Sequence, residues 1–267
     1  MEQITLLGTG NAAVTRCYNS CFTLSEGDRH LLVDGGGGNG ILLQLERAAI
    51  RYQQIGDIIV SHAHTDHLFG VIWVIRMIGA EMGKGSYEGN LNLYAHQELA
   101  NVLTNLLKDT LPKKFFNLLG ERIKLHVVSD GECCTILNHE VTFFDIHSTK
   151  LKQFGFSLVD EQGKRFTFLG DEPYNEKEQC YVAGADWLVH EAFCLYSQRE
   201  QFKPYEKHHA TVKEACEVAQ ELGVKNLLLF HTEDKCIADR KRLYSEEGSS
   251  YYTGNLFVPD DLEVLAL

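Results

Sequence analysis

The stretch SHAHTDHLFG, at residues 61–70, constrains this chain more than any other part of its sequence. Four potential metal ligands fall within six positions here: His62, His64, Asp66 and His67. They follow the apolar run Ile58–Val60, which has the pattern of a short buried strand. Residues two apart at a strand end point to the same side, so the first two histidines can reach one ion. The adjacent Asp and His can reach a second, and other ligands must come from elsewhere in the chain.

Composition is that of an ordinary globular protein. The chain has 267 residues, 44% of them hydrophobic and 23% charged, which suits a single domain spanning residues 1–267. No apolar run approaches the roughly 18–20 residues of a membrane span, so no membrane partner is expected. The beginning, MEQITLLGTG, does not look like a signal peptide. The eight cysteines form no C-x-x-C pair and read as reduced thiols, so a cytoplasmic location is expected.

Charge argues against a nucleic-acid substrate. The formal net charge of −12 would repel phosphate backbones rather than attract them. The densest basic run, Asp239–Arg242, lies in an amphipathic stretch and is expected to form a solvated helix face. Nucleic acid is therefore not the expected partner.

Apolar periodicity predicts strands and helices in alternation along the chain. The expected strands are Ile4–Leu7, Cys21–Leu24, His30–Asp34, Ile58–Val60, Leu91–Ala95, Ile123–Val128, Cys133–Leu137, Val141–Ile146, Phe154–Val159, Arg165–Leu169, Trp187–Val189 and Asn226–Phe230. The expected helices are Ile41–Ile50, Leu68–Ile78, His96–Lys108 and Thr211–Leu222, with a glycine-rich loop at residues 79–90. This order predicts sheets covered by helices, that is, an α/β (α+β) fold. Trp73 and Phe115 are expected to fill the core rather than line a pocket.

Three later stretches each place a candidate ligand after an apolar strand: VTFFDIHS, RFTFLGD and NLLLFHTED supply His147, Asp171 and His231. Together with H-x-H-x-D-H, they make the sequence resemble the metallo-β-lactamase superfamily. The resemblance implies a four-layer αββα sandwich with two divalent metal ions. It assigns His62, His64 and His147 to one metal. It assigns Asp66, His67 and His231 to the other, with Asp171 bridging. Zinc is the expected metal, and the same ligands suit manganese or iron.

Further stretches resemble the ribonuclease Z-like branch of that superfamily. They are Leu7–Gly10 (LGTG), His190–Phe193 (HEAF), His209–Thr211 (HAT), and the Gly155-Phe156 pair that follows His147. By that resemblance Glu191 and His209 form a pair whose members orient one another and serve in proton transfer. Asp66, Glu191 and His209 are then the expected catalytic residues.

One departure from the branch bears on the substrate. In bacterial tRNase Z, a long arm that grips tRNA lies between the third and fourth motifs. Here only the 23 residues from Ser148 to Gly170 fill that interval, and two expected strands occupy much of it. This interval is too short to contain such an arm, so processing of tRNA is not expected.

The predicted function is that of a dinuclear metal-dependent hydrolase of a small phosphodiester. Two metal ions about 3.5–4 Å apart would lower the pKa of a bridging water molecule, and the resulting hydroxide would attack phosphorus. A thioester, lactone or sulfate-ester hydrolase using the same metals remains open, as does a non-catalytic metal-binding or sensing protein. The resemblance also suggests a homodimer.

Overall fold

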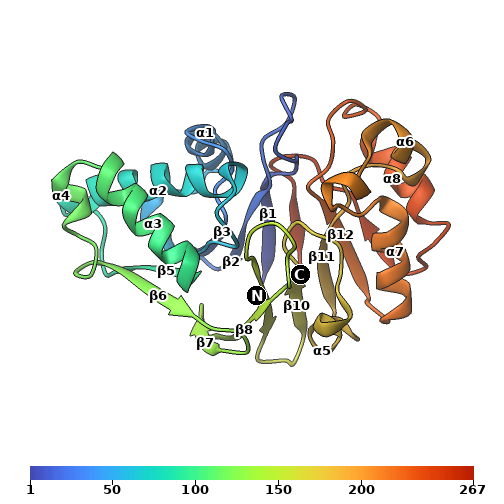
Figure 1. Ribbon diagram of the computed structural model, residues 1–267. Helices are drawn as coiled ribbons and strands as arrows, with labels where there is room; N and C mark the ends of the chain where they lie inside the picture. The colour runs from blue at the N-terminus through green and yellow to red at the C-terminus, as the bar shows by residue number, and fades with distance from the viewer. The chain divides into compact units, whose positions relative to one another are not determined.

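Two seven-stranded mixed sheets form the framework of the computed structural model, which describes residues 1–267 (Figure 1). Each sheet belongs to its own compact unit. The first unit comprises Met1–Gly8, Tyr18–Ser129 and Leu262–Leu267, and the second comprises Thr9–Cys17 and Asp130–Asp261. Each sheet has helices of its own, so the α/β (α+β) class is confirmed. The assignment of residues 1–267 to a single domain stays a prediction.

In the first unit the strands lie in the order β14-β1-β2-β3-β4-β5-β6. Their bounds are β1 Gln3–Gly8, β2 Cys21–Glu26, β3 Arg29–Val33, β4 Ile55–Ile59, β5 Leu91–His96, β6 Ile123–Val128 and β14 Val264–Ala266. The pairs from β14 to β3 are antiparallel, and those from β3 to β6 are parallel. The carboxyl ends of β3, β4 and β5 therefore meet at one edge.

Four helices accompany this sheet: α1 Gly40–Arg47, α2 Thr65–Lys84, α3 Gln97–Thr110 and α4 Lys113–Phe116. The first three cover one face of it (Figure 1). Leu32 and Leu93 of the sheet share a core with Leu45 of α1, Val74 of α2 and Leu103 of α3. Burial of these apolar side chains is the main favourable term holding the helices to the sheet.

In the second unit the strands lie in the order β13-β12-β11-β10-β9-β8-β7. Their bounds are β7 Cys133–Ile136, β8 His139–Asp145, β9 Phe154–Val159, β10 Arg165–Phe168, β11 Trp187–Glu191, β12 Asn226–Phe230 and β13 Asn255–Phe257. The pairs from β7 to β10 are antiparallel, and those from β10 to β13 are parallel. Its helices are α5 Gln179–Val182, α6 Arg199–Phe202, α7 Val212–Glu221 and α8 Arg240–Gly248. Val212, Ala215 and Ala219 of α7 pack in a core with Leu188 of β11 and Leu227 of β12.

Two expectations about α2 are wrong. The loop expected at residues 79–90 begins later, because α2 continues to Lys84. Gly79 remains helical and packs closely on Phe115, where an added Cβ would lie 3.3 Å from the ring. Trp73 is not a core residue, since 40% of it is exposed, whereas Phe115 is buried as expected.

The expectation of a solvated face at residues 239–242 is also wrong in part. Arg240 is fully buried, although Lys241 and Arg242 are exposed. Its guanidinium donates hydrogen bonds to the hydroxyls of Thr9 and Thr232 and to the carbonyl of Pro259. The arginine thereby ties residues 9–17 to the rest of the second unit.

None of the helices combines the length and the apolar character that crossing a membrane requires.

Candidate metal centre

The histidine cluster of the first unit lies where β3 and β4 end side by side. These strands are parallel, with Val33 opposite Ile59, so the residues that follow them meet at one edge. Asp34 follows β3 with a left-handed backbone (φ +57°), which is uncommon outside glycine. Its Oδ1 accepts a hydrogen bond from the backbone N–H of Ser61 at 2.8 Å. The buried carboxylate of Asp34 thus anchors the beginning of the cluster.

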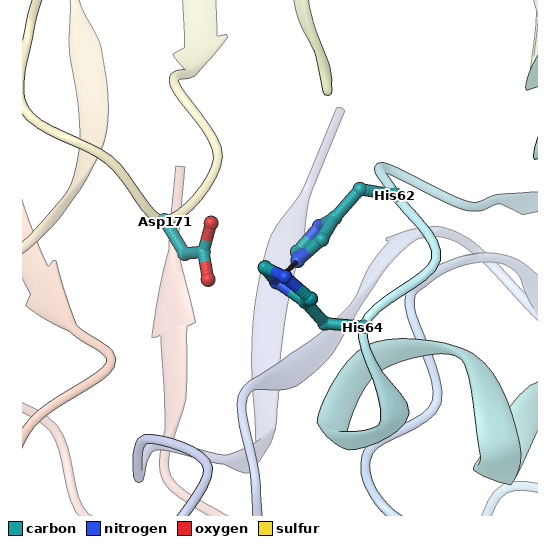
Figure 2. A group of neighbouring side chains, drawn as sticks. All are labelled: His62, His64 and Asp171. Carbon is teal, nitrogen blue, oxygen red and sulfur yellow. Dashed lines mark hydrogen bonds between the residues drawn. The ribbon is translucent and has the colours of Figure 1, made fainter. Parts of the chain in front are cut away.

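A hydrogen-bond chain orients His62. The hydroxyl of Ser61 donates to Oδ2 of Asp34 at 2.6 Å and lies 2.9 Å from Nδ1 of His62. Since the one hydroxyl hydrogen is given to the carboxylate, Nδ1 must donate to Ser61. The lone pair of His62 is then on Nε2, which lies 2.8 Å from Nδ1 of His64 (Figure 2). Two imidazole nitrogens converge on one point, as the ligands of a single ion do.

His67 is oriented by the same carboxylate. Its Nδ1 lies 2.8 Å from Oδ2 of Asp34, and since a carboxylate can only accept, Nδ1 donates. The lone pair therefore falls on Nε2, 3.4 Å from Oδ2 of Asp66. The sequence reasoning missed Asp34 and Ser61, whose hydrogen bonds orient two of the predicted metal ligands. The signal available was an aspartate at the end of the apolar run HLLVD.

Close backbone packing fixes the beginning of α2, which carries Asp66 and His67. The backbone N–H of Gly35 donates to the carbonyl of His67, and that of Gly70 donates to the carbonyl of Gly36. A Cβ on Gly70 would lie 1.7 Å from the carbonyl oxygen of Gly35, so only glycine permits this approach. Gly36 has a positive φ (+70°), which glycine adopts without strain.

In the second unit, three parallel strands place their acidic and imidazole groups at one edge. Asp171 follows β10, Glu191 ends β11, and His231 follows β12. Asp171 is drawn in Figure 2, and its Oδ2 lies 3.5 Å from Nε2 of His231. His231 has a left-handed backbone (φ +55°), as Asp34 has in the first unit. All three side chains are buried.

Glu191 and His209 form the pair expected from the sequence. Nδ1 of His209 lies 3.2 Å from Oε2 of Glu191, and the backbone N–H of Ala210 donates to Oε1. The ring of His209 stacks on Phe193 at 4.9 Å. Burial lowers the pKa of His209 to about 4 and raises the pKa of Glu191 well above its usual range. Burial thus favours the uncharged form of each group.

His231 also lies beside this pair. The ligand atoms of Glu191, His209 and His231 all lie within 4.8 Å of one another, so the pair reaches the predicted metal ligand His231. The chain thus carries imidazole and carboxylate groups at the sheet edges of both units. This donor set, with the lone pairs of His62 and His67 directed by hydrogen bonds from the opposite ring nitrogens, fits a divalent metal such as zinc.

His147 differs from the other predicted ligands. It follows β8 in a left-handed conformation (φ +56°), and its backbone N–H donates to Asp145 at 2.8 Å. His147 is exposed. It does not belong to the group of neighbouring ligand atoms formed by Glu191, His209 and His231. The division of His62, His64, Asp66, His67, His147, Asp171 and His231 between two ions stays a prediction.

Solved structures establish the fold. The chain is similar over 99% of its length to the metallo-β-lactamase fold protein YhfI from Bacillus subtilis, with a TM-score of 0.79 and 19% identity, covering 99% of that chain. It is similar to the short form of human tRNase Z with a TM-score of 0.76 and 20% identity, covering 98% of each chain. Zn(2+)-bound PqqB from Methylobacterium extorquens also gives a TM-score of 0.76, at 13% identity, covering 99% of this chain and 100% of that one.

Sequence relatives agree with the fold. Ribonuclease Z from Prochlorococcus marinus (strain MIT 9303) is 26% identical over 97% of this chain and 91% of its own. That alignment is 309 residues long, more than this chain's 267, so the relative contains segments that are missing here. These matches define a ribonuclease Z-like protein of the metallo-β-lactamase superfamily, whose homologues are metal-dependent hydrolases. Within it, the chain belongs to the family described as Anti-Pycsar protein Apyc1, whose model matches residues 2–248.

Proposed function

We propose that this protein is a dinuclear metal-dependent hydrolase that cleaves a small phosphodiester. The observation that carries the proposal is the orientation of His62 and His67 by Asp34 and Ser61. Hydrogen bonds to the far nitrogen of an imidazole are typical of metal ligands and are not required of structural histidines. The expected ligand sets are the seven residues named above, and zinc is the first metal to test.

The choice of a phosphodiester rests on the relatives and on what this chain lacks. Relatives named ribonuclease Z act, by that name, on the phosphodiester bonds of RNA. In this chain β9 and β10 occupy ten of the 23 residues between Ser148 and Gly170, which leaves no segment for an RNA-gripping arm. The net charge of −12 also disfavours a long polyanion. A small diester contains the same phosphodiester bond as RNA but needs no surface that binds a long polyanion.

The metal ions, when bound, would activate a water molecule and neutralise charge on the phosphate. The chain's own residues then have separable tasks. Asp34 and Ser61 hold the imidazoles of His67 and His62 in the tautomers that present Nε2. Nδ1 of His209 and Oε2 of Glu191 are 3.2 Å apart, close enough for one proton to pass between the two groups. Negative charge developing on the leaving oxygen would draw this proton through the imidazole, an effect worth roughly 10²–10⁴-fold.

The test is turnover of three chromogenic esters by protein of measured metal content. Bis(p-nitrophenyl) phosphate is compared with p-nitrophenyl sulfate and a thioester after Zn, Mn or Fe is restored. The proposal expects diester cleavage that is lost in Asp66→Ala. Cleavage of only the sulfate or only the thioester would show that the protein is a hydrolase of that ester class instead. Metal-loaded protein inert toward all three would favour a binding or sensing role.

A further inference from the structure

Two turns of the second unit that carry predicted ligands lie at the same edge of its sheet. His147 follows β8 and Asp171 follows β10, and both strands run antiparallel to β9, which lies between them. Neighbouring strands are about 4.8 Å apart, so roughly 10 Å separates the two turns. The contacts that span this distance determine how one predicted ligand is held relative to the other.

Glu172 belongs to the turn after β10, and its side chain reaches the turn after β8. Only 6% of the residue is exposed. Oε1 accepts a hydrogen bond from the hydroxyl of Ser148 at 2.7 Å, and Oε2 accepts one from the backbone N–H of Thr149 at 3.2 Å. Nζ of Lys150 lies 3.8 Å from Oε1. One carboxylate therefore holds the three residues that directly follow His147.

A second contact joins the same two turns from the other side. Oε1 of Gln153, at the end of the turn after β8, accepts a hydrogen bond from the backbone N–H of Asp171 at 3.5 Å. Gln153 is fully buried. A Cβ on Gly170 would lie 2.9 Å from this oxygen, so glycine permits the close approach. Each turn thus supplies a buried side chain that accepts a hydrogen bond from the other.

The backbone that precedes His147 is held as well. The N–H of His147 donates to Oδ1 of Asp145 at 2.8 Å, and Nζ of Lys152 lies 3.4 Å from Oδ2 of the same carboxylate. With contacts on both flanks, the side-chain torsions of His147 are the main freedom that remains to its imidazole. A ligand with few free torsions loses less conformational entropy when it binds an ion.

We propose that Glu172 is a positioning residue for His147, because it fixes the backbone from which the imidazole of His147 binds its metal ion. The inference rests on the proposed function, in which His147 is one of the seven metal ligands. Glu172 acts on the affinity for that ion through Ser148 and Thr149, without contacting the ion itself. Since Glu172 directly follows Asp171, the same contacts couple the positions of these two predicted ligands.

Zinc affinity tests the proposal without any turnover. Competition with a chromogenic chelator gives a separate dissociation constant for each of the two expected ions. Glu172→Ala should raise one of these constants by about 10- to 100-fold, the usual effect of losing an outer contact that orients a ligand, and should leave the other unchanged. Glu172→Gln keeps the shape of the side chain and one acceptor oxygen, so this variant should fold and show a smaller rise in the same constant.

Asp160→Ala is the matched control. Oδ1 of Asp160 accepts hydrogen bonds from the backbone N–H groups of Gln162 and Lys164, so this carboxylate holds the turn at the opposite end of β9. Its loss should lower the free energy of unfolding without changing either dissociation constant. If Glu172→Ala raised both constants alike, or if Asp160→Ala raised a constant by the same factor, Glu172 would act only through stability and the proposal would be overturned.

A double-mutant cycle identifies the ligand through which Glu172 acts. In a His147→Ala protein, Glu172→Ala should cause no further rise in the affected constant. A further rise as large as in the unmodified background would overturn the inference, because Glu172 would then act through Asp171. Zinc constants that His147→Ala leaves unchanged would also overturn it, since His147 would not be a ligand. The expected cycle in a protein that binds two ions but hydrolyses no diester would support the inference and count against the proposed function alone.

Discussion

His67 and Asp34, 33 residues apart in sequence, are joined by a hydrogen bond of 2.8 Å between Nδ1 and Oδ2. Because the same carboxylate also holds Ser61, it fixes the tautomers of two predicted metal ligands. Asp34→Asn should lower the affinity for metal by about 10- to 100-fold. Dialysis against a buffered zinc series, followed by elemental analysis, measures that affinity.

Asp57→Asn is the matched control for this change. Asp57 is likewise a buried aspartate of the first sheet, but its carboxylate accepts hydrogen bonds from Asn92 and Tyr94 rather than from the cluster. The metal affinity of the Asp57→Asn protein should equal that of the unmodified protein. Equal losses in the two variants would mean that Asp34 acts only through the fold.

His209→Ala should keep its metal content and lose turnover. If His209 delivers a proton to the leaving oxygen, the loss should approach the upper part of the 10²–10⁴-fold range for an alkoxide leaving group. The loss should be much smaller for p-nitrophenolate, which leaves without protonation. The measurement is kcat for a pair of diesters that differ only in this group.

His208→Asn provides the comparison for that experiment. His208 is exposed, and its left-handed backbone (φ +54°) is one that asparagine tolerates. Its kcat values should match those of the unmodified protein for both esters. A His209→Ala protein with the same leaving-group dependence as the unmodified enzyme would remove the proton-transfer role.

Glu178 should make stability depend on pH. Burial raises the pKa of this carboxyl to about 8 in the folded protein, whereas in the unfolded chain it is near 4.5. Between these values the folded state holds more protons than the unfolded state, so the free energy of unfolding falls as pH rises. Glu178→Gln should therefore gain stability over the unmodified protein progressively from pH 5 to pH 8, by up to a few kcal/mol.

Urea unfolding at pH 5, 6.5 and 8 measures that difference. Glu176→Gln, which alters an exposed carboxyl of the same short helix, should show no such trend. A gain for Glu178→Gln that is constant across the range would mean that the carboxyl is ionised in the folded protein throughout.

The two arginines of α8 should differ sharply in their effect on stability. Arg240→Met leaves the hydroxyls of Thr9 and Thr232 without their buried donor, and should cost about 3–5 kcal/mol. Arg242 makes only exposed ion pairs, with Asp239 and Glu246, so Arg242→Met should cost less than about 1 kcal/mol. Denaturant unfolding of both variants checks this, and equal losses would contradict it.

The sequence predicted most of the fold because its strands are short, apolar and bounded by turn residues. Ile123–Val128, Phe154–Val159 and Asn226–Phe230 were located to the residue. Helix ends were harder to predict, since the glycines at 79 and 83 suggested a loop. Tertiary packing overrode that local preference when Gly79 packed against Phe115.

The candidate site was partly accessible from the sequence. Spacing alone singled out residues 62–67, and the pairing of Glu191 with His209 came from the resemblance and agrees with the geometry. Asp34 and Ser61 were missed because their role depends on which strand lies beside β4. Arg240 was misjudged for a similar reason, since its partners lie at residues 9, 232 and 259, far from any local pattern.

The most direct measurement is a metal titration of stripped protein with diester turnover as the readout. We predict no cleavage of bis(p-nitrophenyl) phosphate without metal, and a rate that rises to a plateau at two ions per chain. His62→Ala and His231→Ala should each bind fewer ions and remain inactive. Turnover undiminished in metal-free protein, or two tightly bound ions without any hydrolysis, would contradict the proposed function.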